Sequence, residues 1–128
     1  MKPISILETA LYVDDLEKAK NFYIDVIGLK FHAEKKGRHV FLECGGGILL
    51  LFNPDSTTKG EIPHGSKGAG HVAFRIAEED FEPWRKRFKD KGVEIEKEVQ
   101  WPEGTRSFYF RDPAGNSLEL ATKELWGL

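Results

Sequence analysis

The sequence has little cysteine and no long apolar run, and both shortages restrict what the protein can be. Its 128 residues include one cysteine, Cys44. A single cysteine rules out an internal disulfide bond and a cysteine-based zinc cluster. The longest apolar run, residues 48–52, has the length of a strand and falls far short of the roughly 20 residues that cross a bilayer. We therefore expect no disulfide-stapled fold and no membrane partner.

A strong charge of one sign is also missing. The formal net charge of −2 gives no electrostatic reason to expect a nucleic-acid partner. The basic cluster at residues 85–89 is flanked by acidic residues, which is typical of a solvated helix face. The opening MKPISILETA lacks the basic and then apolar pattern of a signal peptide, so we expect a cytoplasmic protein.

What is present is the balance of a folded domain. The chain is 40% hydrophobic and 31% charged, a composition typical of globular proteins. A length of 128 residues suits a single domain, which we place at residues 1–128.

Hydrophobic periodicity divides the first half into one helix and four strands. Residues 6–13 are apolar and β-branched, which predicts a strand. Asp14 and Glu17 form a capping-box pattern, so a helix is expected from there to Gly28. Strands are predicted at residues 30–34, 38–43 and 48–52, separated by glycine turns.

A segment rich in proline, glycine and serine follows, at about residues 54–69, and is interpreted as a linker. The same order of elements then returns. A strand is predicted at residues 71–76 and a helix at residues 78–91, ended by Gly92. Three more strands are predicted at residues 94–100, 107–111 and 117–122.

The two halves can be superposed as copies of one β-α-β-β-β unit. Residues 8–13 match residues 71–76, and residues 46–51 match residues 115–120. This repeat predicts an α+β fold of two βαβββ modules, at about residues 5–53 and 70–123. Two such modules would form a curved mixed sheet around a cleft, with the helices outside.

The superposition gathers side chains that bind metals. Glu8 falls on the position of His71, and Leu50 falls on that of Glu119. Glu8, His71 and Glu119 each lie in an otherwise apolar strand. A carboxylate in such a strand needs a partner. Strand alternation turns Glu119 away from Leu118 and Leu120, toward the predicted cleft.

A divalent cation would satisfy both glutamates at once. Two carboxylates and one imidazole suit manganese, iron, nickel, cobalt or zinc. Three protein ligands with Leu50 at the fourth position leave places open for water or substrate, as in catalytic sites. The predicted metal ligands are therefore Glu8, His71 and Glu119.

Three motifs resemble those of the vicinal oxygen chelate superfamily. They are FYFRDPAGNSLEL at residues 108–120, GHVAF at residues 70–74, and the run from Asp14 to Leu29. That superfamily includes glyoxalase I, extradiol dioxygenases, methylmalonyl-CoA epimerase, fosfomycin-resistance enzymes and bleomycin-binding proteins. The resemblance covers roughly residues 5–123.

The resemblance implies a divalent metal in the cleft, held at the positions of Glu8, His71 and Glu119. In the fosfomycin-resistance group the place of Leu50 is also not a ligand. Those proteins are dimers whose site combines both chains, which implies a homodimer here with Glu8 serving the partner's site.

Two departures from the family pattern narrow the chemistry. The glutamate at position 8 replaces the usual histidine, which argues against an iron extradiol dioxygenase. The leucine at position 50 argues against glyoxalase I, which has four ligands. We expect a metal-dependent lyase, isomerase or transferase acting on a small oxygen-chelating substrate. The alternative is a metal-free, bleomycin-resistance-like protein that sequesters a small molecule.

Other candidates have a structural reading as well as a functional one. Tyr109 and Trp101 could line the cleft or pack in the core. Arg111 could hold an anionic substrate or lie on the surface. By analogy with an epoxide-hydrolysing relative, Glu43 is a weak candidate for a general base; no other catalytic residue is assigned. Histidines 32, 39 and 64 are read as solvated or loop residues, with His64 the best placed to swing over a cleft.

Overall fold

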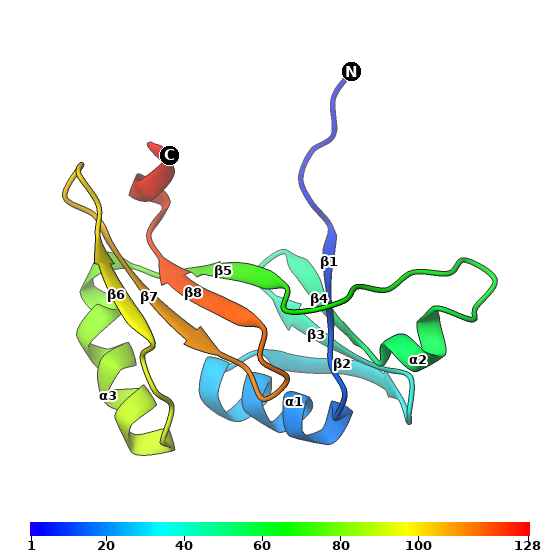
Figure 1. The fold of residues 1–128 in the computed structure, drawn as a ribbon. Helices are drawn as coiled ribbons and strands as arrows, with labels where there is room; N and C mark the ends of the chain where they lie inside the picture. The colour runs from blue at the N-terminus through cyan, green and yellow to red at the C-terminus, as the bar shows by residue number, and fades with distance from the viewer. The chain divides into compact units, whose positions relative to one another are not determined.

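The computed structural model describes all of residues 1–128. The chain divides into two compact units, residues 1–70 and 71–128, and each contains one four-stranded sheet with its helices (Figure 1). The order β-α-β-β-β occurs in both units. The predicted α+β fold of two βαβββ modules is thus confirmed.

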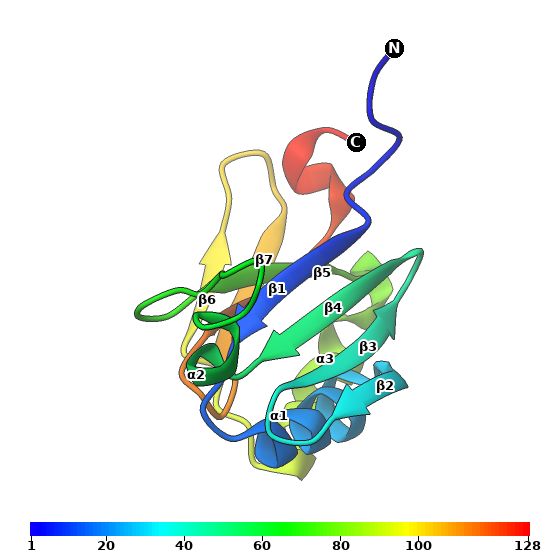
Figure 2. The same ribbon diagram turned by 90° about the vertical axis from the view of Figure 1, so that its right-hand side faces the viewer.

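The first unit forms a mixed sheet with the strand order β1-β4-β3-β2 (Figure 2). β1 runs parallel to β4, and the other neighbours are antiparallel. Its elements are β1 (Glu8–Tyr12), α1 (Leu16–Phe22), the π-helix η1 (Tyr23–Ile27), β2 (Lys30–Lys35), β3 (His39–Cys44), β4 (Gly47–Phe52) and α2 (Pro54–Thr57).

The first helix starts one residue later than the capping-box pattern predicts. The N-cap is Asp15, whose carboxylate accepts a hydrogen bond from the backbone N–H of Lys18 at 3.0 Å. Asp14 instead accepts from the N–H of Asp15. Gly28 ends the helical stretch as predicted, with a φ of 86° that favours glycine.

One face of the first sheet forms the core of its unit. Alternate residues are buried along β1 and the residue after it, and along β3 and β4, namely Leu11, Val13, Val40, Leu42, Leu49 and Leu51. The buried side chains of the helical stretch are Ala19, Tyr23, Val26 and Ile27. Since strand side chains alternate, Ala10, Phe41 and Leu50 lie on the opposite face, called here the open face of the first sheet.

The second unit repeats this arrangement with the strand order β5-β8-β7-β6. β5 is parallel to β8, and the other pairs are antiparallel. Its elements are β5 (His71–Arg75), the 3-10 helix η2 (Glu78–Asp80), α3 (Phe81–Lys91), β6 (Lys97–Gln100), β7 (Arg106–Arg111), β8 (Ser117–Ala121) and the 3-10 helix η3 (Lys123–Trp126).

Aromatic rings join α3 to the second sheet. The ring of Phe81 lies 5.1 Å from that of Phe108, and the ring of Phe88 lies 4.6 Å from that of Phe110. All four side chains are fully buried. The helix therefore covers the face that carries the even-numbered residues of β7, and the odd-numbered residues lie on the open face of the second sheet.

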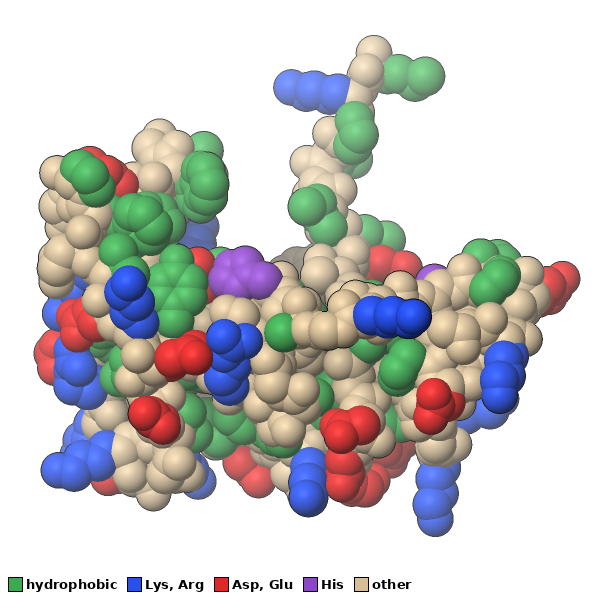
Figure 3. Space-filling view, in the orientation of Figure 1, with side chains coloured by type: hydrophobic (Ala, Val, Ile, Leu, Met, Phe, Trp, Pro, Cys, Tyr) green, Lys and Arg blue, Asp and Glu red, His purple; other side chains and the backbone are tan.

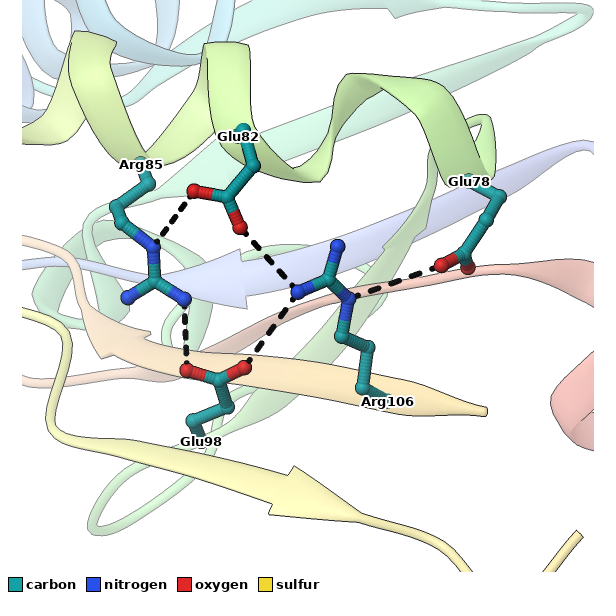
Figure 4. Close-up of polar contacts among 5 residues, drawn as sticks. All are labelled: Glu78, Glu82, Arg85, Glu98 and Arg106. Carbon is teal, nitrogen blue, oxygen red and sulfur yellow. Dashed lines mark hydrogen bonds and ion pairs between the residues drawn. The ribbon is translucent and has the colours of Figure 1, made fainter. Parts of the chain in front are cut away.

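A network of ion pairs connects η2 and α3 to β6 and β7 (Figure 4). Arg106 pairs with Glu82 at 3.3 Å, with Glu78 at 3.7 Å and with Glu98 at 3.8 Å. Arg85 pairs with Glu98 at 2.8 Å and with Glu82 at 3.2 Å. Arg106 is thus engaged in holding the unit together.

The structure differs from the sequence prediction in several bounds. The first strand begins at Glu8 and not at residue 6, and β6 begins at Lys97 and not at residue 94. The predicted helix at residues 78–91 opens as the 3-10 helix η2. The predicted linker contains the short helix α2, which Asn53 caps by accepting from the N–H of Asp55.

Exposed apolar side chains gather near the two ends of the chain. Ile4, Ile6 and Leu7 are exposed along the extended N-terminal segment, which projects from the first unit (Figure 3). Trp126 and Leu128 are exposed at the C-terminal end. No helix in the structure has the length and apolar character required to span a membrane.

Candidate metal centre

β8, one of the two inner strands of the second sheet, carries a buried carboxylate. Leu118 and Leu120 of β8 are fully buried on the side that α3 covers. Glu119 lies between them and therefore points to the open face, as predicted. Its side chain is only 7% exposed. A carboxylate in such a place is costly unless other groups satisfy it.

Strand pairing decides which side chains surround Glu119. Ala73 of β5 lies on one side of it and Tyr109 of β7 lies on the other. His71 is two residues before Ala73 and so shares the same face. Ala73 has a small side chain, and His71 and Tyr109 lie on the same face as Glu119.

The imidazole of His71 is oriented by the backbone. Its Nδ1 lies 3.0 Å from the carbonyl oxygen of Ser117. Because a carbonyl oxygen only accepts hydrogen bonds, Nδ1 carries the proton and donates it. In the neutral ring Nε2 is then left with a free lone pair, and Nε2 is the atom that faces Glu119. Metal-binding histidines are typically oriented in this way.

The distance between His71 and Glu119 fits two ligands of one cation. Nε2 of His71 lies 3.5 Å from Oε2 of Glu119, which is long for a hydrogen bond. Two donor atoms that are each about 2.1 Å from a tetrahedral metal lie roughly 3.4 Å apart. The second oxygen, Oε1, is buried and has no hydrogen-bond partner. An unsatisfied buried carboxylate oxygen beside an imidazole lone pair is a donor set that suits a divalent metal.

Tyr109 completes the polar surroundings of the carboxylate. Its ring lies 6.3 Å from the His71 ring and is inclined to it by 20°. Burial raises the pKa of the Tyr109 phenol, and the hydrogen bond and negative charge of Glu119 raise it further. The phenol is therefore a neutral hydrogen-bond donor over the whole physiological range.

The first sheet holds the same positions with different side chains. Leu50 of β4 lies between Ala10 of β1 and Phe41 of β3, as Glu119 lies between Ala73 and Tyr109. Glu8 precedes Ala10 by two residues, as His71 precedes Ala73. The strand registers thus agree with the superposition of the two halves drawn from the sequence.

Two of the three predicted ligands come together. His71 and Glu119 belong to the second unit and face each other. Glu8 belongs to the first unit, where its neighbour on β4 is Ile48. Neither unit gathers three or more His, Cys, Asp or Glu side chains into a group that could hold a metal. The three-residue ligand set therefore stays a prediction.

The predicted substrate-binding residues have partners of their own. The indole N–H of Trp101 donates to the hydroxyl of Ser107 at 2.8 Å. Arg111 pairs with Glu96 at 3.0 Å and donates to the carbonyl of Gly115. Both Trp101 and Arg111 are thus held by groups of the second unit, and a role in substrate binding stays a prediction for them and for Tyr109.

The weak catalytic candidate Glu43 lies in the first unit. It is on β3, on the same face as Phe41, and pairs with Lys30 at 3.4 Å. His32 lies 3.9 Å from it, with an exposed side chain. The role of Glu43 as a general base stays a prediction.

An aromatic cluster on the open face of the first sheet escaped the sequence analysis. His39 and Phe41 stack with their centroids 4.0 Å apart, and Phe41 contacts Phe52 at 5.7 Å. Tyr12 lies 6.2 Å from Phe52, and His64 lies 4.7 Å from it. Alternation along β1, β3 and β4 could have placed the strand residues together. His64 lies outside any regular element, so the sequence predicts it only as a loop residue that could swing over a cleft and gives no contact with Tyr12 or Phe52.

His39 should titrate below the ordinary histidine range of about 6.5. Burial lowers its pKa, and the charges of Arg38 and Lys35 lower it further. Arg38 also donates to its Nδ1 at 2.7 Å, a bond that the protonated ring would lose. Folding stability linked to His39 is therefore present above about pH 6.5 and is lost as the pH falls toward the lowered pKa. NMR titration of the imidazole measures the pKa, and Arg38→Ala should raise it.

Known proteins are similar to this chain over most of its length. The profile of the Glyoxalase/Bleomycin resistance protein/Dioxygenase superfamily matches residues 5–120. The chain is 37% identical over 116 residues to glutathione transferase FosA of Serratia marcescens, covering 91% of this chain and 79% of the relative. It is 34% identical over 122 residues to metallothiol transferase FosB of Bacillus licheniformis, covering 94% and 77%.

A solved structure extends the similarity to the whole chain. The crystal structure of lactoylglutathione lyase from Agrobacterium tumefaciens is 42% identical, with a TM-score of 0.95 and 99% of both chains covered. These relatives are transferases and a lyase. They confirm the predicted class, an enzyme of the glyoxalase and transferase type, over a metal-free binding protein.

Proposed function

Because this chain belongs to the Glyoxalase/Bleomycin resistance protein/Dioxygenase superfamily, we propose that it is a divalent-metal-dependent transferase that joins a thiol to a small oxygen-bearing substrate. The observation that carries the proposal is the pair of His71 Nε2 and the buried carboxylate of Glu119, whose Oε1 has no hydrogen-bond partner. The predicted three-ligand set, with Leu50 at the fourth position, favours a transferase over a four-ligand lyase.

We propose that His71, Glu119 and Glu8 hold the metal. Glu8 would come from the first unit of the same chain or of a partner chain. Two carboxylates and a neutral imidazole suit manganese, zinc, nickel, cobalt or iron(II). The buried position of Glu119 supports this assignment, because a divalent cation offsets the cost of burying its charge.

Each residue of the site would have a separate task. When bound, the metal would polarise a substrate oxygen and stabilise the negative charge that develops on it. His71 would keep its Nε2 lone pair directed at the metal, because Ser117 holds the Nδ1 proton. The neutral phenol of Tyr109 would donate a hydrogen bond to a substrate oxygen and orient it. In thiol addition to an epoxide, a C–S bond forms, a C–O bond breaks and the oxygen takes up a proton.

Glutathione is the thiol that we propose. It occurs in the names of two relatives, glutathione transferase FosA and lactoylglutathione lyase. A lyase that acts on a glutathione adduct is the second candidate function. The 42% identity over 99% of both chains favours this candidate, whereas the predicted ligand set favours the transferase.

We further propose a homodimer, in the cytoplasm as predicted from the sequence. Each sheet ends in a strand with one neighbour, β1 beside β4 and β5 beside β8. Such edges are open to pairing with another strand. The exposed apolar residues Ile4, Ile6 and Trp126 would be covered in a dimer. A shared site would then draw Glu8 from the partner chain.

The transferase is tested by incubating the purified protein with glutathione and fosfomycin, or with glutathione and methylglyoxal, with and without added Mn²⁺. We expect adduct formation with fosfomycin that a chelator abolishes and Mn²⁺ restores. Turnover of methylglyoxal alone would select the lyase. Metal-independent turnover of either substrate would contradict the proposed function.

A further inference from the structure

The segment that leaves α2 is a long loop attached to the first sheet at one place. Residues 58–69, called here the strap, follow α2 in the first unit (Figures 1 and 2). Eleven of these twelve residues are exposed, and His64 is the exception. Ile62, two positions earlier, is 84% exposed. His64 is thus the one residue of the strap that is not fully exposed.

His64 makes both a polar and an aromatic contact there. Its Nδ1 lies 2.6 Å from the hydroxyl of Tyr12 on β1. Its ring meets that of Phe52 on β4, with centroids 4.7 Å apart and an inclination of 72°. The backbone N–H of His64 donates to the carbonyl of Thr57 at 3.1 Å. The contacts of His64 with Tyr12 and Phe52 are called here the anchor of the strap.

Beneath His64 lies the aromatic cluster of the open face. Phe52 is its centre, in contact with Tyr12, His39 and Phe41. The guanidinium of Arg38 lies 5.4 Å from the Phe52 ring centre, a cation–π contact. The floor under the strap therefore offers a flat apolar surface, a phenol hydroxyl and a positive charge.

The second unit has no such floor. The residues that match Tyr12, Phe52 and His39 in strand register are Arg75, Ala121 and Ser107. The two sheets have the same backbone arrangement, so sheet formation does not require the aromatic floor. It is a property of the first unit alone.

We propose that residues 58–69 form a strap that closes over this aromatic floor, and that the His64 imidazole occupies a slot for a planar heteroaromatic ring. A ligand with such a ring and a hydrogen-bonding nitrogen takes the place of His64 against Phe52 and Tyr12. The strap then opens, because every other residue of the strap is exposed. This proposal does not depend on the proposed function.

The slot is tested by removing the ring and returning it as a free molecule. His64→Gly deletes the imidazole, and imidazole itself is the probe. We expect isothermal titration calorimetry to show one imidazole bound per His64→Gly chain and none bound to the wild type. Adding Tyr12→Phe should weaken this binding about fivefold, the worth of one hydrogen bond. No saturable binding to His64→Gly would overturn the slot.

The strap is tested by limited trypsin digestion, read by mass spectrometry at Lys59 and Lys67. His64→Gly should be cleaved at both sites about tenfold faster than the wild type, because cleavage follows the population of the open loop. Imidazole should restore protection. Ile62→Gly, which adds a glycine to the same strap without touching the anchor, should leave the rate unchanged.

Two outcomes would overturn the strap. One is equal cleavage of His64→Gly and Ile62→Gly, and the other is faster cleavage that imidazole does not reverse. If His64→Gly does not fold, Tyr12→Phe in the wild-type chain removes only the hydroxyl and should still speed cleavage at Lys59 and Lys67 a few-fold. An unchanged rate in that variant would contradict the anchor.

Discussion

Replacing Glu119 with glutamine should stabilise the metal-free protein and abolish its binding of divalent metal. The carboxylate is buried, and its Oε1 has no hydrogen-bond partner. A neutral amide costs less to bury, and its N–H can donate to the lone pair of His71 Nε2. We expect the free energy of unfolding without metal to rise by about 1–2 kcal/mol.

Metal should reverse this order of stability. A ligand that binds only the folded state raises the apparent stability, so wild-type protein should gain from added Mn²⁺ or Zn²⁺. Glu119→Gln lacks an anionic ligand, and its metal affinity should fall by more than about 100-fold. Thermal denaturation with and without metal measures both effects in one experiment.

Glu96→Gln is the matched control for this substitution. Glu96 is an exposed carboxylate of the same unit, paired with Arg111. Its loss should change stability by less than about 1 kcal/mol and leave metal binding intact. A Glu119→Gln variant that binds metal as tightly as the wild type would contradict the assignment of Glu119 as a ligand.

The second large effect is expected at the turn between β7 and β8. Asp112 and Asn116 are buried there. Oδ1 of Asp112 accepts from the backbone N–H groups of Ala114 and Asn116, at 3.0 and 2.8 Å. Its Oδ2 accepts from the side-chain amide of Asn116 at 2.9 Å. This carboxylate therefore fixes the chain directly before Ser117, whose carbonyl orients His71.

Asp112→Ala should destabilise the protein by about 3 kcal/mol and weaken metal binding. The substitution leaves three donors without their acceptor, one of them the buried backbone N–H of Asn116. Release of the turn also shifts Ser117, so His71 loses its fixed orientation, for which we expect a loss of about tenfold or more in metal affinity. Urea denaturation and metal titration measure the two effects.

Two variants make this result specific. Asp112→Asn keeps an acceptor for the two backbone donors and loses the bond to the Asn116 amide. We therefore expect it to lower the free energy of unfolding by about half as much as Asp112→Ala does. Asp90→Ala removes an exposed carboxylate that pairs only with Lys86 on α3, and should cost under about 0.5 kcal/mol. Equal costs for Asp112→Ala and Asp90→Ala would contradict the structural role of the turn.

The repeat was the most predictable part of this fold. Apolar alternation and glycine at helix ends are local signals, and they placed seven of the eight strands within two residues of their observed starts. Strand alternation also predicted correctly that Glu119 points away from the helix. The choice between Asp14 and Asp15 as N-cap was missed, because both carboxylates fit the pattern and the end of β1 decides which one caps.

Contacts between distant segments were less predictable. Glu8, His71 and Glu119 could be selected by chemistry and position, whereas the orientation of His71 depends on a carbonyl 46 residues away. Arg111 looked available for an anion because no sequence pattern shows that Glu96 lies opposite it. His64 was interpreted as a loop residue. Its hydrogen bond with Tyr12 joins residues 52 positions apart, which no local pattern in the sequence shows.

The most direct test of the metal centre is elemental analysis of protein purified without chelator, combined with titration of the metal-free form with Mn²⁺, Ni²⁺ and Zn²⁺. We predict about one divalent metal per chain for the wild type, and none for His71→Ala or Glu119→Ala. A wild-type protein that contains no metal and takes up none of the three ions would contradict the account.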